Sequence, residues 1–193
     1  APEILSLEKV ELLLEQPRGE EDKEVRDKAM LELLYATGIR VTELISLKVS
    51  DLNLPLEYIH CGSEAKSRII PIGAQAKASL HKYMERVREH MISVPEEEAL
   101  FVNCNGRPMT TEAIHRVIKI AGKAVGVSRD IRVSPHTCRH TFAQMQLKNG
   151  LDLYSLSRLM GHSNISITQR YLEGLRDFEV LNACKATGIL MNL

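Results

Sequence analysis

Side chains that can bind an anion or transfer a proton gather in the second half of this 193-residue chain. Residues 136–140 read His-Thr-Cys-Arg-His, residues 159–162 read Leu-Met-Gly-His, and residues 168–171 read Thr-Gln-Arg-Tyr. Upstream, Arg40 stands in the string ATGIRVTEL. Arginine is always charged and its planar guanidinium matches a phosphate, whereas histidine exchanges protons near neutral pH. These residue types together indicate chemistry at a phosphate group.

Several widespread catalytic motifs are missing from the sequence. It contains no G-x-x-x-x-G-K-[ST] or G-x-G-x-x-G loop, no G-x-S-x-G turn and no H-E-x-x-H pair. ATP hydrolysis, dinucleotide redox chemistry and lipase-type or zincin-type hydrolysis therefore lose support. The acidic clusters at 20–22 and 96–98 fall in expected loops, where solvated surface is a better interpretation than a magnesium site. We expect no cofactor and no metal.

Basic residues are unevenly distributed, although the chain carries no net charge. Residues 1–101 hold 13 basic and 19 acidic side chains, whereas residues 102–171 hold 10 and 3. Such a basic block is typical of a protein that binds a polyanion, and a solvated basic face would give the same count. The composition excludes disorder, and no run of about 20 apolar residues predicts a membrane span. The four cysteines form no C-x-x-C pair, so we expect reduced thiols in a cytoplasmic protein.

Helical periodicity dominates the segments that must position these side chains. Apolar spacing predicts helices over 7–14, 25–34, 41–47, 74–90, 110–124, 135–149, 152–160, 165–173 and 176–185. Ser6 is expected to cap the first helix and Gly38 to end the second. Period-two patterns predict strands over 52–54, 57–60 and 68–72. The fold class is therefore mainly α with a small antiparallel β-sheet (α+β).

Taken together, these motifs resemble those of the tyrosine recombinase family, the phage integrases and Xer-type recombinases. Residues 36–44 are similar to the pattern A-T-G-[LI]-R-x-[ST]-E-L, and residues 136–143 to H-x-[LC]-R-H-T-F-A. Residues 156–171 are similar to L-x-x-[LM]-[LM]-G-H-x-x-[IV]-x-x-T-x-x-Y. The resemblance extends from about Leu5 to Tyr171 and implies the fold of the family's catalytic domain.

The resemblance also implies cleavage of DNA without a metal ion. Arg40 and Arg139 would clamp the non-bridging oxygens of the phosphate, and His162 would be a third donor. Tyr171 would attack the phosphorus with His136 as base, because a phenol with a pKa near 10 is a poor nucleophile by itself. The product would be a 3′-phosphotyrosyl bond and a free 5′ hydroxyl. No high-energy cofactor is then required, since one phosphodiester replaces another.

In this family a lysine of the β-hairpin protonates the leaving 5′ oxygen, and this sequence departs from the family at the position of that lysine. The family pattern resembles G-K-G-x-K-x-R-x-x-P-[LI], whereas residues 62–72 read GSEAKSRIIPI. Counting back from Pro71 places Ser63 at the lysine position and Lys66 at the second basic position. Hairpin turns move and vary in length, so Lys66 is our candidate acid. If Lys66 cannot reach the leaving oxygen, the enzyme would be slow or would use another acid.

Glu43 and His140 are assigned supporting roles. We expect Glu43 to orient a neighbouring cation, with a surface carboxylate as the alternative interpretation. His136 and His140 stand at i and i+4, a spacing that can bind zinc, but Cys138 should face away and no third ligand is found. His140 is therefore expected to make hydrogen bonds. Contacts with DNA phosphates, or else a solvated surface, are expected from five basic residues: Arg116, Lys119, Lys123, Arg129 and Arg132.

These features predict a site-specific recombinase, chromosomal or from a mobile element, that acts on double-stranded DNA as a homotetramer. Residues 1–175 would form the catalytic domain, and residues 176–193 a tail helix that docks on a neighbouring protomer or folds back. The family's amino-terminal core-binding domain is expected to be absent from this chain. Two alternatives remain: relaxation of DNA like a type IB topoisomerase, and a catalytically impaired DNA-binding module, which Ser63 suggests.

Overall fold

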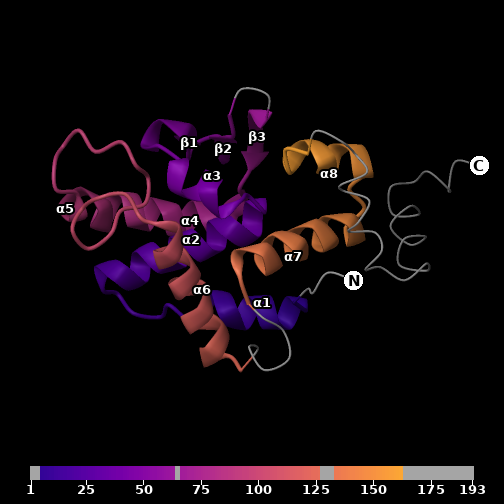
Figure 1. Cartoon of the computed structure of the whole chain (residues 1–193), viewed down its shortest axis with the longest axis horizontal. Coiled ribbons are helices and arrows are strands. Elements are labelled where there is room, and N and C mark those ends of the chain that lie inside the picture. The colour runs from indigo at the N-terminus through magenta and orange to yellow at the C-terminus, as the bar shows by residue number, and fades with distance from the viewer. Residues whose placement is uncertain (1–4, 64–65, 127–132, 163–193) are drawn as a thin grey trace, which may run out of the picture.

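The computed structural model describes residues 5–63, 66–126 and 133–162. It is mostly helical with one three-stranded antiparallel sheet, as the sequence predicts (Figure 1). In chain order the elements are α1 (Leu7–Leu14), α2 (Asp22–Thr37), α3 (Val41–Ser46), the 3₁₀ turn η1 (Val49–Asp51), β1 (Leu52–Asn53), β2 (Tyr58–Cys61), β3 (Arg68–Pro71), α4 (Gly73–Tyr83), the π-helical turn η3 (Met84–Arg88), α5 (Glu89–Met91), α6 (Thr111–Ala124), α7 (Pro135–Lys148) and α8 (Leu153–Leu159). The helices expected over 165–173 and 176–185 lie outside the described residues. No helix within the described part of the chain is long and apolar enough to span a membrane.

Helix α2 runs through the centre of the fold, where it packs against α4 and α7. Consecutive turns of α2 are buried, and residues such as Leu31 and Leu33 are fully enclosed. The helix ends at Gly38, whose φ of 64° lies in the left-handed region that favours glycine. A β-carbon at Gly38 would lie 2.3 Å from Cδ1 of Phe142, so this position also requires a residue without a side chain. The abrupt end of α2 places Arg40 at the N-cap of α3.

The sheet has the order β1-β2-β3, and both strand pairs are antiparallel. Ile59 is paired with Ile70, and both side chains are buried against the helices. The paired residues His60 and Ile69 are exposed, as the alternation of a half-buried sheet requires. Lys66, which lies between β2 and β3, is exposed.

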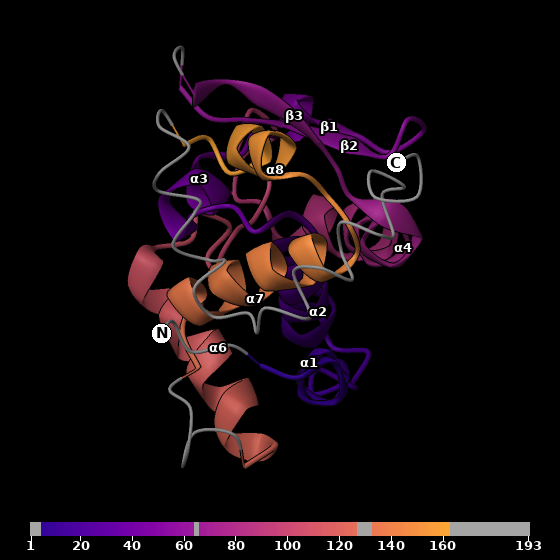
Figure 2. The same cartoon turned by 90° about the vertical axis from the view of Figure 1, so that its right-hand side faces the viewer.

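Helix α8 contacts β3 of the β2–β3 hairpin, and α7 packs against α8. The Ser134 side chain accepts a hydrogen bond from the Thr137 N–H and caps α7. Between α7 and α8, apolar side chains such as Phe142 of α7 and Leu156 of α8 form a separate buried cluster with Met160. The views in Figures 1 and 2 place α8 between the sheet and α7. The end of α8 consequently lies beside both the hairpin and the middle of α7.

The single helix expected over 74–90 is interrupted by a π-helical turn, η3. A π turn holds one more residue than an α turn, which rotates the following side chains around the helix axis. Arg88 at its end is buried, and its Nη2 donates to the carbonyls of Glu97 and Ala99, each at 2.7 Å. The helix predicted over 74–90 is thus present as a continuous helical segment from Gly73 to Met91, with a π turn that the prediction did not include.

Candidate active site

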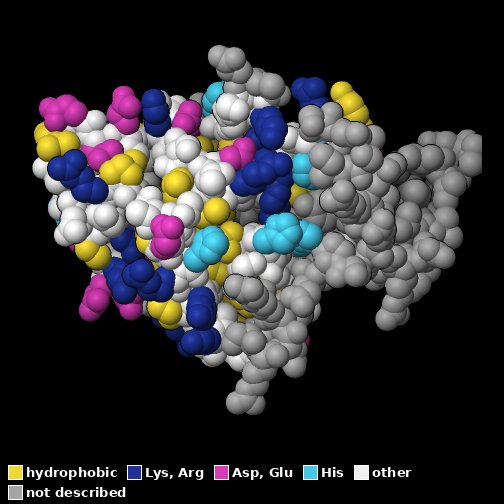
Figure 3. All heavy atoms as spheres, in the orientation of Figure 1, with side chains coloured by type: hydrophobic (Ala, Val, Ile, Leu, Met, Phe, Trp, Pro, Cys, Tyr) yellow, Lys and Arg dark blue, Asp and Glu magenta, His cyan; other side chains and the backbone are white. Residues whose placement is uncertain are grey.

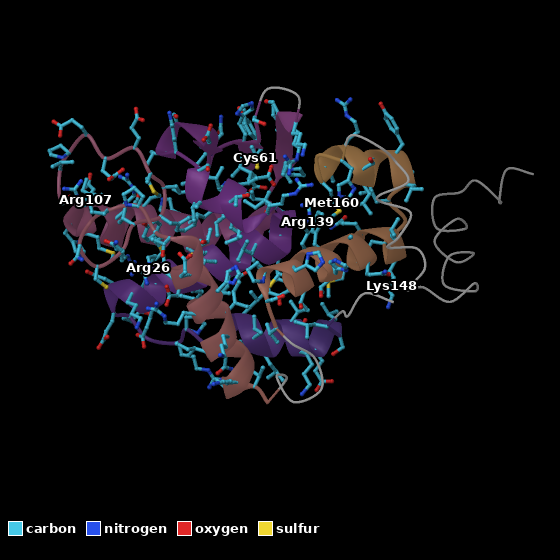
Figure 4. All side chains as sticks on the ribbon, viewed as in Figure 1. Arg26, Cys61, Arg107, Arg139, Lys148 and Met160 are labelled. Atoms are coloured by element: carbon cyan, nitrogen blue, oxygen red, sulfur yellow. The ribbon has the colours of Figure 1, made fainter. Side chains whose placement is uncertain are left out.

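Arg139 projects from α7 toward the ends of α2 and α8, next to Met160 (Figure 4). The residue is only 5% exposed. Its Nη1 donates to the carbonyl of Gly38 at 2.6 Å, and its Nη2 donates to the carbonyl of Met160 at 2.7 Å. A buried charge is costly unless it is well hydrogen-bonded, and these two carbonyls help to meet that requirement. They also fix the plane of the guanidinium.

Arg40 reaches the same carbonyl from the start of α3. Its Nη1 donates to the Met160 carbonyl at 3.2 Å, and its side chain is about one third exposed. Two guanidinium groups that share one acceptor oxygen lie close enough to hold a single anion between them. The structure thus brings together two arginines that are 99 positions apart in the sequence.

His162 completes the group around the Met160 carbonyl. Gly161, with a φ of 68°, turns the chain after α8, and the His162 N–H donates to the Ser157 carbonyl at 3.0 Å. The His162 Nε2 lies 3.2 Å from Nη2 of Arg139. Burial and then the nearby cations, Arg139 foremost, lower the pKa of His162 to about 4. His162 is therefore neutral at pH 7. The three residues predicted from the sequence, Arg40, Arg139 and His162, thus lie together around the Met160 carbonyl.

His136 and His140 form a pair on α7. Their Nε2 atoms lie 2.7 Å apart, so one ring donates a hydrogen bond and the other accepts it. Burial, followed by His136 and Arg139, lowers the pKa of His140 to about 4. Cys138 is buried. Within the described ranges there is no group of three or more His, Cys, Asp or Glu side chains that could hold a metal ion.

Glu43 lies between Arg40 and Arg68, a residue for which no role was predicted. Its carboxylate accepts from Nη1 and Nη2 of Arg68 at 2.6 and 3.0 Å and from the Arg40 N–H at 3.0 Å. Burial alone would raise the pKa of Glu43, but these hydrogen bonds and the two guanidinium charges hold the pKa at about 2. Arg68 matches the arginine of the hairpin pattern, which was the signal available for it in the sequence.

A cleft of about 430 Å³ opens beside Arg40. Arg40 and Glu43 line one part of it, and His60, Ser63 and Lys66 line another. Figure 3 shows Lys and Arg side chains gathered with His side chains on the face where the hairpin, α8 and α7 meet. Lys66, the candidate acid, and Ser63, which occupies the family's lysine position, thus line the same cleft as Arg40.

The other sequence-predicted residues divide into two groups. Arg116, Lys119 and Lys123 lie on the exposed face of α6. Three further candidates lie outside the described residues: Arg129, Arg132 and Tyr171. The structure therefore places the anion-binding side of the predicted site and leaves the predicted nucleophile as a sequence-based expectation.

Acid is expected to weaken the fold through His140 and His162. Both have a pKa lowered from 6.5 to about 4 in the folded chain, whereas the unfolded chain protonates these rings near 6.5. Their stabilising contribution is full above pH 6.5 and is lost as the pH falls from 6.5 through 4. We expect His140→Gln to reduce the fall in Tm between pH 7 and pH 4, measured by circular dichroism. His115→Gln, at an exposed position of α6, is the control, and equal pH slopes for all three proteins would contradict the assignment.

Comparison with known proteins defines the class to which this arrangement belongs. Residues 3–176 match the phage integrase family, and the chain belongs to that family. The tyrosine recombinase XerD of Halalkalibacterium halodurans is 41% identical over 171 residues, which cover 88% of this chain and 56% of that protein. The tyrosine recombinase XerD of Oceanobacillus iheyensis is 45% identical over 172 residues, with coverages of 88% and 57%. The chain thus spans little more than half the length of these curated relatives.

Solved structures confirm the predicted fold. XerA recombinase matches with a TM-score of 0.81 at 31% identity, covering 95% of this chain and 65% of that chain. XerH recombinase in a post-cleavage complex with its palindromic difH substrate matches with a TM-score of 0.78 at 21% identity, with coverages of 98% and 54%. The fold is that of a tyrosine recombinase catalytic domain, as the motifs around Arg40, Arg139 and His162 implied.

Proposed function

We propose that this chain is the catalytic part of a site-specific recombinase that cleaves and rejoins double-stranded DNA through a 3′-phosphotyrosyl intermediate. One observation carries the proposal: Arg40 and Arg139 donate to the same carbonyl oxygen beside His162. This cluster has the donor types that a phosphodiester needs, gathered around one carbonyl oxygen. The names of the relatives, tyrosine recombinases, support the same activity.

The clamp stabilises the negative charge that grows on the non-bridging oxygens as phosphorus is attacked. Arg40 and Arg139 face these oxygens as fixed, fully charged donors, which is the arrangement that stabilises such a transition state most strongly. His162, neutral at pH 7, contributes one N–H without bringing a further positive charge between the arginines. The group binds the transition state better than the substrate, which is the requirement for catalysis.

Two proton transfers accompany the exchange of bonds. The Tyr171 hydroxyl attacks phosphorus and gives its proton to His136, whose ring is held by His140 at 2.7 Å. The 5′ oxygen leaves and takes a proton from Lys66, which lines the cleft next to Arg40. Because a phosphotyrosyl ester replaces the DNA phosphodiester, the energy of the bond is conserved for rejoining.

The wider assembly is part of the same proposal. Residues 1–175 form the catalytic domain, and four copies assemble on two DNA sites, with residues 176–193 of each copy docked on a neighbour. Basic side chains add contacts with DNA phosphates: the exposed Arg116, Lys119 and Lys123 of α6, and also Arg129 and Arg132, which lie outside the described residues. XerH recombinase, which has this fold, is bound to its difH substrate in two solved structures, and this supports the proposed binding of DNA.

Covalent trapping tests the proposal directly. A duplex with a nick close to the cleavage point releases a short fragment after attack, so rejoining is prevented and the adduct accumulates. We expect the full chain, at low salt, to form an adduct that survives denaturing electrophoresis on a nicked duplex from a panel of candidate recombination sites. Binding without adduct on every duplex would favour the impaired DNA-binding module. Relaxation of a supercoiled plasmid without a recombination site would favour a topoisomerase-like activity.

A further inference from the structure

Arg68, at the start of β3, connects three parts of the site. Its side chain is 8% exposed. Its Nη1 and Nη2 donate to both carboxylate oxygens of Glu43, Nη1 also donates to the Lys66 carbonyl at 3.0 Å, and Nε donates to the Leu159 carbonyl at 2.7 Å. The guanidinium therefore joins α3, the hairpin turn and the end of α8. A fork of five donors can make this set of bonds, whereas a lysine ammonium cannot.

The backbone of Lys66 is held on both sides. Its N–H donates to the Ser63 carbonyl at 2.7 Å, and its carbonyl accepts from Arg68. The hydroxyl of the next residue, Ser67, lies 2.7 Å from Nε2 of His60 on the neighbouring strand. The main chain at Lys66 is thus fixed, while its long side chain lines the cleft beside Arg40.

Two glycines let the backbone approach Arg68 closely. A β-carbon at Gly62, in the hairpin turn, would lie 2.9 Å from Nη1 of Arg68, and one at Gly161, after α8, would lie 2.8 Å from the same atom. Both glycines have positive φ values, 97° and 68°. The guanidinium is therefore enclosed between the turn that carries Lys66 and the segment that carries His162. The place of Arg68 sets the spacing between these two segments.

We propose that Arg68 is a positioning residue that holds Lys66 at the leaving 5′ oxygen, so that a lysine three residues beyond the family's usual position serves as the general acid. This inference rests on the proposed function. In the step concerned, the bond from the Tyr171 oxygen to phosphorus forms and the bond from phosphorus to the 5′ oxygen breaks. Lys66 gives one proton to that oxygen and becomes neutral, while the tyrosine proton passes to the base. Arg68 touches none of the reacting atoms and acts through the Lys66 main chain.

A pair of nicked duplexes that differ in one atom isolates this role. In the second duplex, sulfur replaces the bridging 5′ oxygen at the cleavage point. A thiol has a pKa of about 8.5, so a thiolate leaves without being protonated, whereas an alkoxide does not. On the oxygen duplex, we expect Lys66→Met to slow single-turnover adduct formation by about 100-fold and Arg68→Lys by at least about tenfold. On the sulfur duplex, both variants should react within about threefold of the unsubstituted chain.

Arg26→Lys is the matched control. Arg26 is as buried as Arg68, and it pairs with Asp27 and donates to the Val102 carbonyl, outside the site. Its substitution should leave the rates on both duplexes unchanged at a temperature below the unfolding transition, which circular dichroism monitors. Arg68→Gln is a second variant. Glutamine retains a donor for Glu43 but lacks the fork of guanidinium donors, and its rate is measured on the same two duplexes.

The outcomes separate this inference from the proposed function. An Arg68→Lys variant that is slow on both duplexes, or normal on both, would overturn the positioning role. A Lys66→Met variant with an unchanged rate on the oxygen duplex would overturn it as well, because Lys66 would then not be the acid. Absence of adduct from the unsubstituted chain on both duplexes would instead overturn the proposed function.

Discussion

Replacement of Tyr171 by phenylalanine is expected to abolish the covalent protein–DNA adduct. The change removes only the hydroxyl oxygen that would bond to phosphorus, and loss of a nucleophile of this kind lowers the rate by about 10⁴-fold or more. The proposed binding of phosphate by Arg40 and Arg139 would not involve that oxygen, so we expect the affinity for DNA to change by less than about twofold. Denaturing electrophoresis with the nicked duplex measures the adduct, and fluorescence anisotropy at low salt measures the binding.

Tyr154→Phe is the control for this experiment. Tyr154 lies on α8 and is 64% exposed, so the loss of its hydroxyl should affect neither measurement. Persistence of the adduct in the Tyr171→Phe protein would show that another side chain is the nucleophile. Equal loss of DNA binding and adduct would assign Tyr171 to binding instead of chemistry.

Arg139→Lys is expected to slow adduct formation by about 10²- to 10³-fold, the usual effect of removing one donor to a developing oxyanion. Lysine keeps the charge but lacks the planar fork that donates at once to the carbonyls of Gly38 and Met160. The ammonium can satisfy these carbonyls or face a phosphate, but it cannot keep a fixed orientation toward both. Single-turnover rates at saturating DNA measure the loss.

Arg158→Lys provides the matched substitution at an exposed position of α8 and should retain the full rate. Arg139 is buried and Arg158 is exposed, so the substitution of Arg139 could also lower the stability of the fold. Thermal unfolding of both variants shows whether a slower reaction is due to a loss of stability. If Arg139→Lys cleaved DNA as fast as the unsubstituted chain while folding normally, the clamp would have to consist of other residues.

The features of the fold that follow from local patterns could be predicted from the sequence. Apolar spacing indicated the helices that became α1, α2, α6, α7 and α8, and Gly38 ends α2 as expected. Period two indicated the sheet, and the structure places Ile59 and Ile70 on its buried face. The π turn before Glu89 was not predicted, and Arg88 at its end meets its partners, the carbonyls of Glu97 and Ala99, only in the folded chain.

The same distinction applies to the site. Arg40, Arg139 and His162 could be selected because each stands in a recognisable string, and the structure places them together. Arg68 was not selected, because its role depends on Glu43, 25 positions away, and on Leu159, 91 positions away. A single arginine in a strand pattern carries no local sign of partners at that distance.

The shared carbonyl of Met160 has a consequence for the energetics of catalysis. Two like charges repel each other, and here the dipole of one peptide group, fixed by the packing of α8, offsets that repulsion while the chain folds. If the proposed function holds, a phosphate would meet an electrostatic field that is already preorganised, and little solvent or side-chain rearrangement would remain for the transition state. A substitution that loosens Met160 would slow the reaction without removing any charged group.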